Sequence, residues 1–376
     1  MFRRSVREAR GSAAVSVLAA AGALAAAALL LGPAPAAHAV RLSWSGAVVA
    51  DGKHLVDVDD PEELTTPGTI VEWSLKAVAE VSDRVTVSAR LCTSCHGIAV
   101  DQAYAELRWT PQLNLEAGRI NVPFGDFVQR HDPASDAFLS KPLPYAMGHM
   151  LRYQVDRFNL GVIPMPYVDN GASAFGDVWI RDALQIWYAL YAVNGFTSGS
   201  PRDFTFKNQV ADTGFPDNNR TPSWGARLAL AQGPATLGAS FLRGAYDPLT
   251  EFEYEAWGVD ASLWEHGFQL RAEYLERATD VLDGEDRALL RKKGFYLQLE
   301  SPEWRRFAAV GRFDGLLREG PPLATDNDRS SGVTRWTTGV SFSPTLDTQL
   351  RLQFEYWRFT DFDGIGVVHA GVVTTY

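Results

Sequence analysis

Two cysteines and a histidine are the residues whose types and spacing most clearly indicate a specific chemistry. The chain has two cysteines in all, and both fall in the run C-T-S-C-H-G at positions 92–97. C-x-x-C-H is the attachment pattern of c-type haem, in which both thiols bond to the porphyrin and the histidine binds iron. The sequence therefore predicts haem c on Cys92 and Cys95, with His96 as proximal ligand. A Cys92–Cys95 disulfide and a bound metal ion are the open alternatives.

A haem iron usually takes a second axial ligand, and methionine and histidine are common choices. Met147, His149 and Met150 stand close together in one segment. Each of the three is a candidate distal ligand. The alternative is that these methionines fill apolar gaps between a long loop and the residues around it.

The first 39 residues have the pattern of an export segment. Four arginines precede a long run rich in alanine and leucine, and Ala37-His38-Ala39 fits the small-x-small cleavage pattern. We therefore expect residues 1–39 to be a cleavable signal peptide and residues 40–376 to be the mature chain. An uncleaved membrane anchor is the alternative, because the apolar run is long.

The mature chain is expected to be all-β. Segments such as 268–274, 295–300 and 350–356 alternate strictly between apolar and polar residues, which marks strands with one face of each kind. A soluble β-sandwich and a membrane barrel both give this pattern. Strand-length runs of about nine to eleven residues and a final strand ending in Tyr376 favour the barrel. Trp109, Trp264 and Trp357 lie near strand ends, where the aromatic girdles of a barrel belong.

Sixteen antiparallel strands are expected in this transmembrane barrel. An even number places both chain ends on the periplasmic side, so the longer connections face outward. The hairpin tip at 92–97 then lies at the outer mouth. The longest connection, 126–170, follows the fifth strand, and we expect it to fold inward as a constriction-type loop. The predicted strands, with ends given to within a few residues, are 41–50, 69–80, 84–92, 98–109, 113–122, 171–181, 184–195, 222–232, 235–245, 253–264, 267–278, 293–301, 305–314, 333–343, 348–359 and 366–376.

One short stretch carries a family resemblance. Residues 117–125, A-G-R-I-N-V-P-F-G, resemble the G-R-x-x-x-P-F-G stretch of phosphate-selective-type porins of the bacterial outer membrane. Together with the C-x-x-C-H run, the chain also resembles monohaem cytochrome–porin fusions. The resemblance to porins implies contact with outer-membrane lipid and assembly as a homotrimer. The resemblance to the fusions implies electron exchange with periplasmic or extracellular cytochromes.

Two functions follow from these patterns. The first is electron transfer across or at the outer membrane by a barrel that carries one haem c. The alternative is a passive diffusion porin for small solutes or anions, with a Cys92–Cys95 disulfide and no haem. The spacing of residues gives no nucleophile motif, so an enzyme is not expected, and the net charge of −10 argues against a nucleic-acid partner.

The predicted lumen carries charges of both signs, which favours weak ion selectivity. The residues expected to face it are Arg271, Arg312, Arg351, Glu273, Glu300, Asp314 and Glu355.

Overall fold

The computed structural model describes most of the chain after residue 39. The predicted signal peptide, 1–39, therefore lies outside the described residues. The described residues are 40–56, 64–65, 68–94, 97–130, 135–146, 152–153, 161–163, 165, 167–180, 183–198, 217–321, 330–360 and 364–376.

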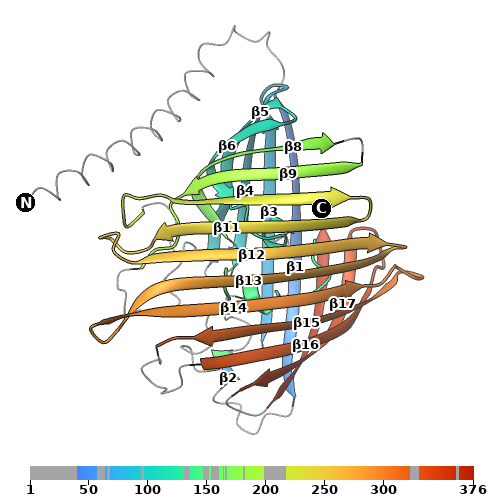
Figure 1. Ribbon diagram of the computed structural model, residues 1–376. Coiled ribbons are helices and arrows are strands. Elements are labelled where there is room, and N and C mark those ends of the chain that lie inside the picture. Colours follow the sequence, from blue (N-terminus) through green and yellow to red (C-terminus); the bar gives the residue numbers. More distant parts are fainter. Residues whose placement is uncertain are drawn as a thin grey trace, which may run out of the picture.

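Sixteen of the described strands form one closed antiparallel barrel (Figure 1). Strand β1 (Arg41–Val56) pairs with β3 on one side and with β18 on the other, which closes the barrel. The other barrel strands are β3 (Thr69–Glu80), β4 (Val85–Ser94), β5 (Gly97–Thr110), β6 (Leu113–Asn121), β8 (Val168–Ile180), β9 (Leu184–Val193), β10 (Ser223–Gln232), β11 (Ala235–Ala245), β12 (Glu253–Glu265), β13 (Phe268–Asp283), β14 (Asp286–Glu300), β15 (Phe307–Glu319), β16 (Ser330–Phe342), β17 (Thr348–Phe359) and β18 (Ile365–Thr375).

The predicted sixteen-stranded fold is confirmed, strand for strand. The main difference is length on the side of the long connections, where β1, β13, β14 and β15 run several residues further than predicted. There the outward residues become charged, as at Arg287 and Arg291, while the backbone ladder continues. Two further strands, β2 (Leu64–Thr65) and β7 (Arg152–Tyr153), were not predicted and form a separate small sheet.

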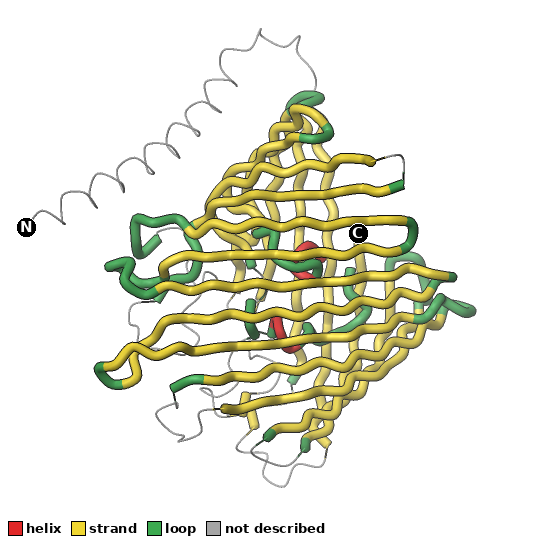
Figure 2. The backbone as a smooth tube through the Cα atoms, in the orientation of Figure 1, coloured by secondary structure: helices red, strands yellow, loops and turns green. Residues whose placement is uncertain are grey.

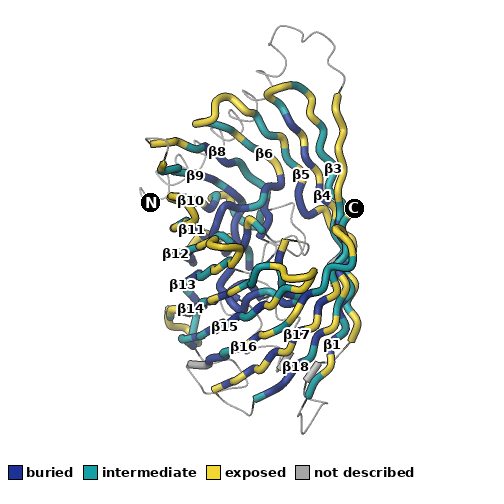
Figure 3. The backbone as a smooth tube through the Cα atoms, turned by 90° about the vertical axis from the view of Figure 1, so that its right-hand side faces the viewer, coloured by how far each residue is buried: buried dark blue, intermediate teal, exposed yellow. Residues whose placement is uncertain are grey.

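The barrel strands turn polar side chains inward and apolar side chains outward, the reverse of strands in a soluble protein. Along β17, Arg351, Gln353 and Glu355 are buried, whereas Leu352 and Phe354 between them are exposed. Figure 3 shows the same alternation of buried and exposed residues around the wall. Charged residues thus face the interior and apolar ones the outside, which fits a barrel surrounded by lipid and excludes the β-sandwich. No helix among the described residues is long and apolar enough to cross a membrane.

Exposed tryptophans ring the end of the barrel that carries the short turns. Trp109 and Trp264 are 61% and 62% exposed there, as predicted for an interface girdle. Trp44, Trp179 and Trp304 join them at the same end. The prediction for Trp357 was wrong: its ring faces inward, is buried, and donates from Nε1 to Glu355 Oε2 at 2.9 Å. The reason is that side chains alternate between the two faces of β17, and position 357 lies on the inward face with 351, 353 and 355.

The last residue completes the closure between β1 and β18. The backbone of Tyr376 exchanges two hydrogen bonds with Gly46, at 3.0 and 3.1 Å. Its ring lies over Gly46, where any side chain would collide with it. The Tyr376 hydroxyl accepts from Trp73 Nε1 at 2.8 Å and donates to the Ser74 carbonyl at 3.2 Å.

Candidate functional site

The connection from β6 to β8 lies inside the barrel over residues 122–130, 135–146, 161–163, 165 and 167. It contains two short 3-10 helices, η1 (Phe127–Arg130) and η2 (Leu143–Tyr145), which Figure 2 shows within the ring of strands. Its apolar side chains are almost fully buried and form one cluster with inward residues of β6, β9 and β11–β18. The loop members of this cluster are Val122, Phe124, Phe127, Val128, Leu143, Tyr145, Val162, Ile163, Met165 and Tyr167.

One polar anchor fixes the beginning of this loop to the wall. The Glu273 carboxylate on β13 accepts from the Asp126 backbone N–H at 3.1 Å and from the Tyr145 hydroxyl at 2.6 Å. Burial, together with the Glu273 carboxyl, raises the pKa of Tyr145 well above its usual value, so the hydroxyl remains a donor. Gly125 is required here, because its φ is +73° and a side chain would collide with both Tyr145 and Glu273.

A second anchor holds the middle of the loop against β15, β16 and β17. Arg335 is fully buried and contacts Asp314 at 2.5 Å and Glu355 at 3.2 Å. The same guanidinium donates to the Lys141 backbone carbonyl of the loop at 2.6 Å. Asp314 in turn accepts from the Leu143 backbone N–H at 2.9 Å. One arginine and two carboxylates therefore bind wall and loop together.

The second anchor extends in both directions along the inner wall. Ser140 of the loop donates to Glu355 and accepts from Arg312. On the other side, His369 lies between Glu355, at 3.4 Å, and Asp51, at 3.1 Å. This chain of contacts reaches from β15 to β1 and so crosses the seam where the barrel closes.

All seven charged residues predicted for the lumen face the interior by strand alternation. Most of them serve the anchors or pair within the wall, as Arg271 does with Glu300 at 3.1 Å. Arg335, His369 and Asp51 were not predicted from the sequence. The period-two alternation could have found Arg335, because it lies two residues from the inward Val333 and Thr337.

An opening remains on the other side of the lumen, between the loop and the wall made by β3, β4, β5, β6, β8 and β9. It has a volume of about 420 Å³ and mixes basic, acidic, amide and aromatic side chains. The wall contributes Lys76, Arg90, Gln102, Tyr104, Glu116, Ser173, Phe175 and Trp187; Asn121, Pro123, Gln129, Arg130 and Ser135 come from the loop and the strand end before it. We call this opening the passage. Its volume has room for a small molecule, and its walls carry both signs of charge.

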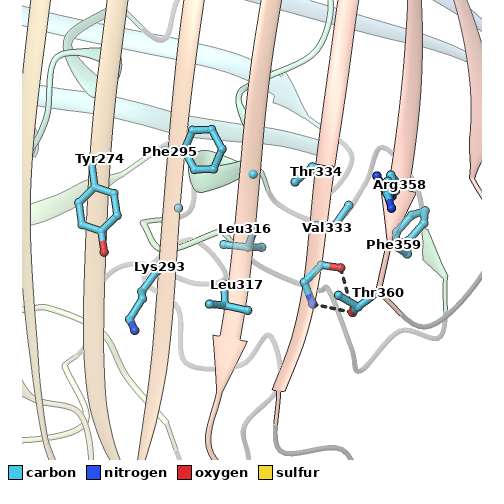
Figure 4. Close-up of a pocket in the computed structure, with 13 residues that line it drawn as sticks. Tyr274, Lys293, Phe295, Leu316, Leu317, Val333, Thr334, Arg358, Phe359 and Thr360 are labelled. Carbon is cyan, nitrogen blue, oxygen red and sulfur yellow. Dashed lines mark hydrogen bonds between the residues drawn. The ribbon is translucent and has the colours of Figure 1, made fainter.

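A second hollow, of about 680 Å³, lies on the outer face over β13–β17 (Figure 4). Tyr274, Lys293, Phe295 and Leu317 belong to the outward face by alternation, so this hollow opens to the outside of the barrel. Gly315 leaves room beside the Phe295 ring. The hollow is outside the barrel and forms no part of the passage.

Cys92 lies on β4, in register with Ser74 of β3 and Ala99 of β5. It shares the inward parity of the buried Ser88 and Arg90. Its thiol is free, whereas the predicted alternative joins it to Cys95. Cys95 and His96 of the predicted haem site lie outside the described residues.

The described surroundings of Cys92 are charged. Arg90, Asp101, Lys141 and Glu72 are all close enough to act electrostatically on its thiol. Haem needs apolar walls, so these neighbours fit it poorly. The described residues also contain no cluster of three or more His, Cys, Asp or Glu that could hold a metal ion.

The predicted distal ligands Met147, His149 and Met150 lie outside the described residues. The neighbouring Met165 is described and is fully buried in the apolar cluster, where its backbone N–H donates to the Tyr145 carbonyl at 3.1 Å. Met165 therefore has the packing role that was the alternative for the methionines of this loop.

Comparison with known proteins supports the architecture. No protein-family model matches the chain, and no curated protein matches it. Among solved structures, Salmonella typhi OmpF in complex with daunomycin is 11% identical, with a TM-score of 0.62, covering 90% of this chain and 98% of OmpF. The anion-selective porin of Comamonas acidovorans is 10% identical, with a TM-score of 0.61, 90% of this chain and 100% of the porin being covered.

A third structure, the outer-membrane channel DcaP of Acinetobacter baumannii, is 10% identical, with a TM-score of 0.56 and coverage of 91% and 99%. Identities this low show similarity of fold alone. The resemblance to cytochrome–porin fusions finds no support in these structures. What this chain shares with them is the closed antiparallel barrel of the porin type, which in this chain has sixteen strands.

Proposed function

We propose that this protein is a passive diffusion porin of the bacterial outer membrane. The observation that carries the proposal is the passage, an opening of about 420 Å³ between an anchored internal loop and the inner wall of β3–β9. The mixed charges of the passage walls favour no single class of solute, and the anchored loop sets the width of the passage. Structures of similar fold are described as porins or channels of the outer membrane, which supports the same role here.

Location and assembly follow from the same proposal. Export through the predicted signal peptide would deliver residues 40–376 to the outer membrane, where the apolar outer face meets lipid. We further propose a homotrimer formed through the outer faces of β1, β3, β4, β5 and β18. These faces carry small side chains such as Ala50, Ala89, Ala105 and Ala370, whereas β12–β17 present large aromatic and leucine side chains. A similar fold, Vibrio cholerae OmpT, is described in a trimer form.

A liposome-swelling assay with neutral sugars tests the transport proposal. Purified protein in liposomes is expected to admit monosaccharides quickly and trisaccharides slowly, because one passage of fixed width controls entry. Protein-free liposomes are the control. Equal rates for all sugars, or no swelling at all, would contradict the proposal.

Haem c on Cys92, Cys95 and His96 stays a prediction of the sequence, with electron transfer as its consequence. The absorption spectrum of the purified protein decides it. A diffusion porin without haem shows no Soret band and no peroxidase stain after denaturing electrophoresis. A covalent Soret band that disappears on Cys92→Ser would restore the electron-transfer function.

A further inference from the structure

Three aromatic side chains line the passage on its wall side: Tyr104 of β5, Phe175 of β8 and Trp187 of β9. All three are partly exposed. Phe175 and Trp187 lie outside the apolar cluster that the internal loop forms, and neither packs against it. Their rings are therefore left facing the passage, on a wall whose other lining side chains are polar. We call Tyr104, Phe175 and Trp187 the aromatic path.

The strand register places the aromatic path along one diagonal of the wall. Tyr104 lies two residues from the partner of Glu116 on β5, toward the outer end. Phe175 lies two residues from the partner of Glu116 on β8, toward the short turns, and Trp187 lies two residues from the partner of Phe175 on β9, in the same direction. Diagonal neighbours of this kind are about 7–8 Å apart, within reach of aromatic side chains. The aromatic path therefore follows the length of the passage, with one carboxylate between its first two rings.

Uncharged polar groups of the passage are available to a solute. The side-chain amides of Gln102 on the wall and Gln129 on η1 make no hydrogen bond within the described part of the chain, and neither does the indole N–H of Trp187. An amide group both donates and accepts hydrogen bonds. Hydroxyl groups do both as well, so these amides match a solute that is rich in hydroxyls.

The charged groups of the passage largely neutralise one another. Arg130 pairs with Asp126 at 2.6 Å, and Arg90 has a carboxylate partner on β5 at 3.5 Å. Lys76 and Glu116 are the other charged lining residues, one of each sign. Because these charges balance, the passage favours neither anions nor cations, and an uncharged polar solute fits it best.

We propose that the aromatic path is a binding site for neutral pyranose sugars, from monosaccharides to short linear oligosaccharides. A pyranose has an apolar C–H face, which packs on an aromatic ring, and hydroxyls at its edge, which match the amides and the Glu116 carboxylate. Successive rings along the wall allow a sugar chain to pass from one ring to the next. The inference rests on the proposed porin function and names the class of solute that the passage favours.

The test measures how maltotriose blocks the ion current through single channels in planar bilayers. A polyethylene glycol of equal mass is the probe that has no sugar rings. The variants are Trp187→Ala, Phe175→Ala and Trp187→Phe, the last of which keeps an aromatic ring. The matched control is Trp179→Ala, because Trp179 lies at the same end of the barrel but points outward and is 60% exposed. The open-channel conductance of each variant shows that it is folded and inserted.

Maltotriose should block the unaltered protein and the Trp179→Ala control at a lower concentration than the polyethylene glycol does. The half-blocking concentration of maltotriose should rise about two- to tenfold in Trp187→Ala and in Phe175→Ala, the effect of losing one aromatic contact. Trp187→Phe should stay close to the unaltered protein. The open-channel conductance should not fall in the alanine variants, because a smaller side chain leaves more room in the passage.

The same half-blocking concentration in Trp187→Ala, Phe175→Ala and Trp179→Ala would overturn the site. Equal block by maltotriose and the polyethylene glycol would overturn it as well, because size alone would then explain the block. Both outcomes leave a conducting channel, so they are distinguishable from failure of the porin function, in which no conductance is seen at all.

Discussion

A bulky charged group attached at position 129 should close most of the passage. Gln129 lies on η1, is exposed, and lines the opening of about 420 Å³ between loop and wall. We expect the Gln129→Cys variant, made with Cys92 and Cys95 replaced by serine, to conduct normally until a bulky thiol reagent is added. The conductance should then fall several-fold, because the adduct occupies space that solutes need. Single-channel recording before and after the reagent measures the effect.

The control for this experiment is Asp83→Cys in the same background. Asp83 is exposed in the short turn between β3 and β4, so it reacts with the reagent but lies away from the passage. Its labelling should leave the conductance unchanged. A labelled Gln129→Cys channel that conducts as before would place the solute path elsewhere in the lumen.

Replacing Arg335 with alanine should cost about 3–5 kcal/mol of stability, the usual result of leaving buried carboxylates without their partner. Arg335 is fully buried and holds both Asp314 and Glu355, at 2.5 and 3.2 Å. Its loss also removes the bond to the Lys141 carbonyl of the loop. We therefore expect the Arg335→Ala variant to unfold at a lower urea concentration and to give larger, noisier conductance steps. Equilibrium unfolding in detergent and bilayer recording measure the two effects.

Arg243→Ala serves as the matched control for stability. Arg243 and Glu253 form an ion pair of 2.5 Å, but both side chains are about half exposed. Such pairs contribute little, generally below about 1 kcal/mol. If Arg335→Ala unfolds at the same urea concentration as Arg243→Ala, the second anchor does not hold the loop.

The barrel was predictable from the sequence because each strand has its own local pattern of apolar and polar residues. Each strand repeats with period two, and the apolar face marks lipid as clearly as the polar face marks the interior. Stretches such as β17, with leucine, phenylalanine and tyrosine alternating with arginine, glutamine and glutamate, allow one assignment of faces. The extra length of β13 and β14 was missed because above the membrane that contrast is lost while backbone pairing continues.

The anchors were not predictable, because they join residues far apart in the chain. Leu143 binds Asp314 through its backbone N–H, and Lys141 binds Arg335 through its backbone carbonyl. Residue types do not indicate such backbone contacts. Alternation places Arg335 on the inner face but cannot say which loop segment it will reach. For Trp357, the prediction relied on the residue type and ignored the alternation along β17, which turns this side chain inward.

The C-x-x-C-H run shows the limit of a motif read in isolation. Its spacing indicates a cofactor, but Cys92 lies in a paired strand with charged neighbours from both wall and loop. A haem site depends on an apolar enclosure that the motif itself does not encode.

The most direct test of a loop-bounded diffusion channel is the single-channel conductance of the purified, unmodified protein in a planar lipid bilayer. We predict discrete, stable current steps that vary linearly with voltage, as expected for a water-filled passage held at fixed width by two anchors. Bilayers that stay at the baseline current, with correctly folded protein shown to be inserted, would contradict the account.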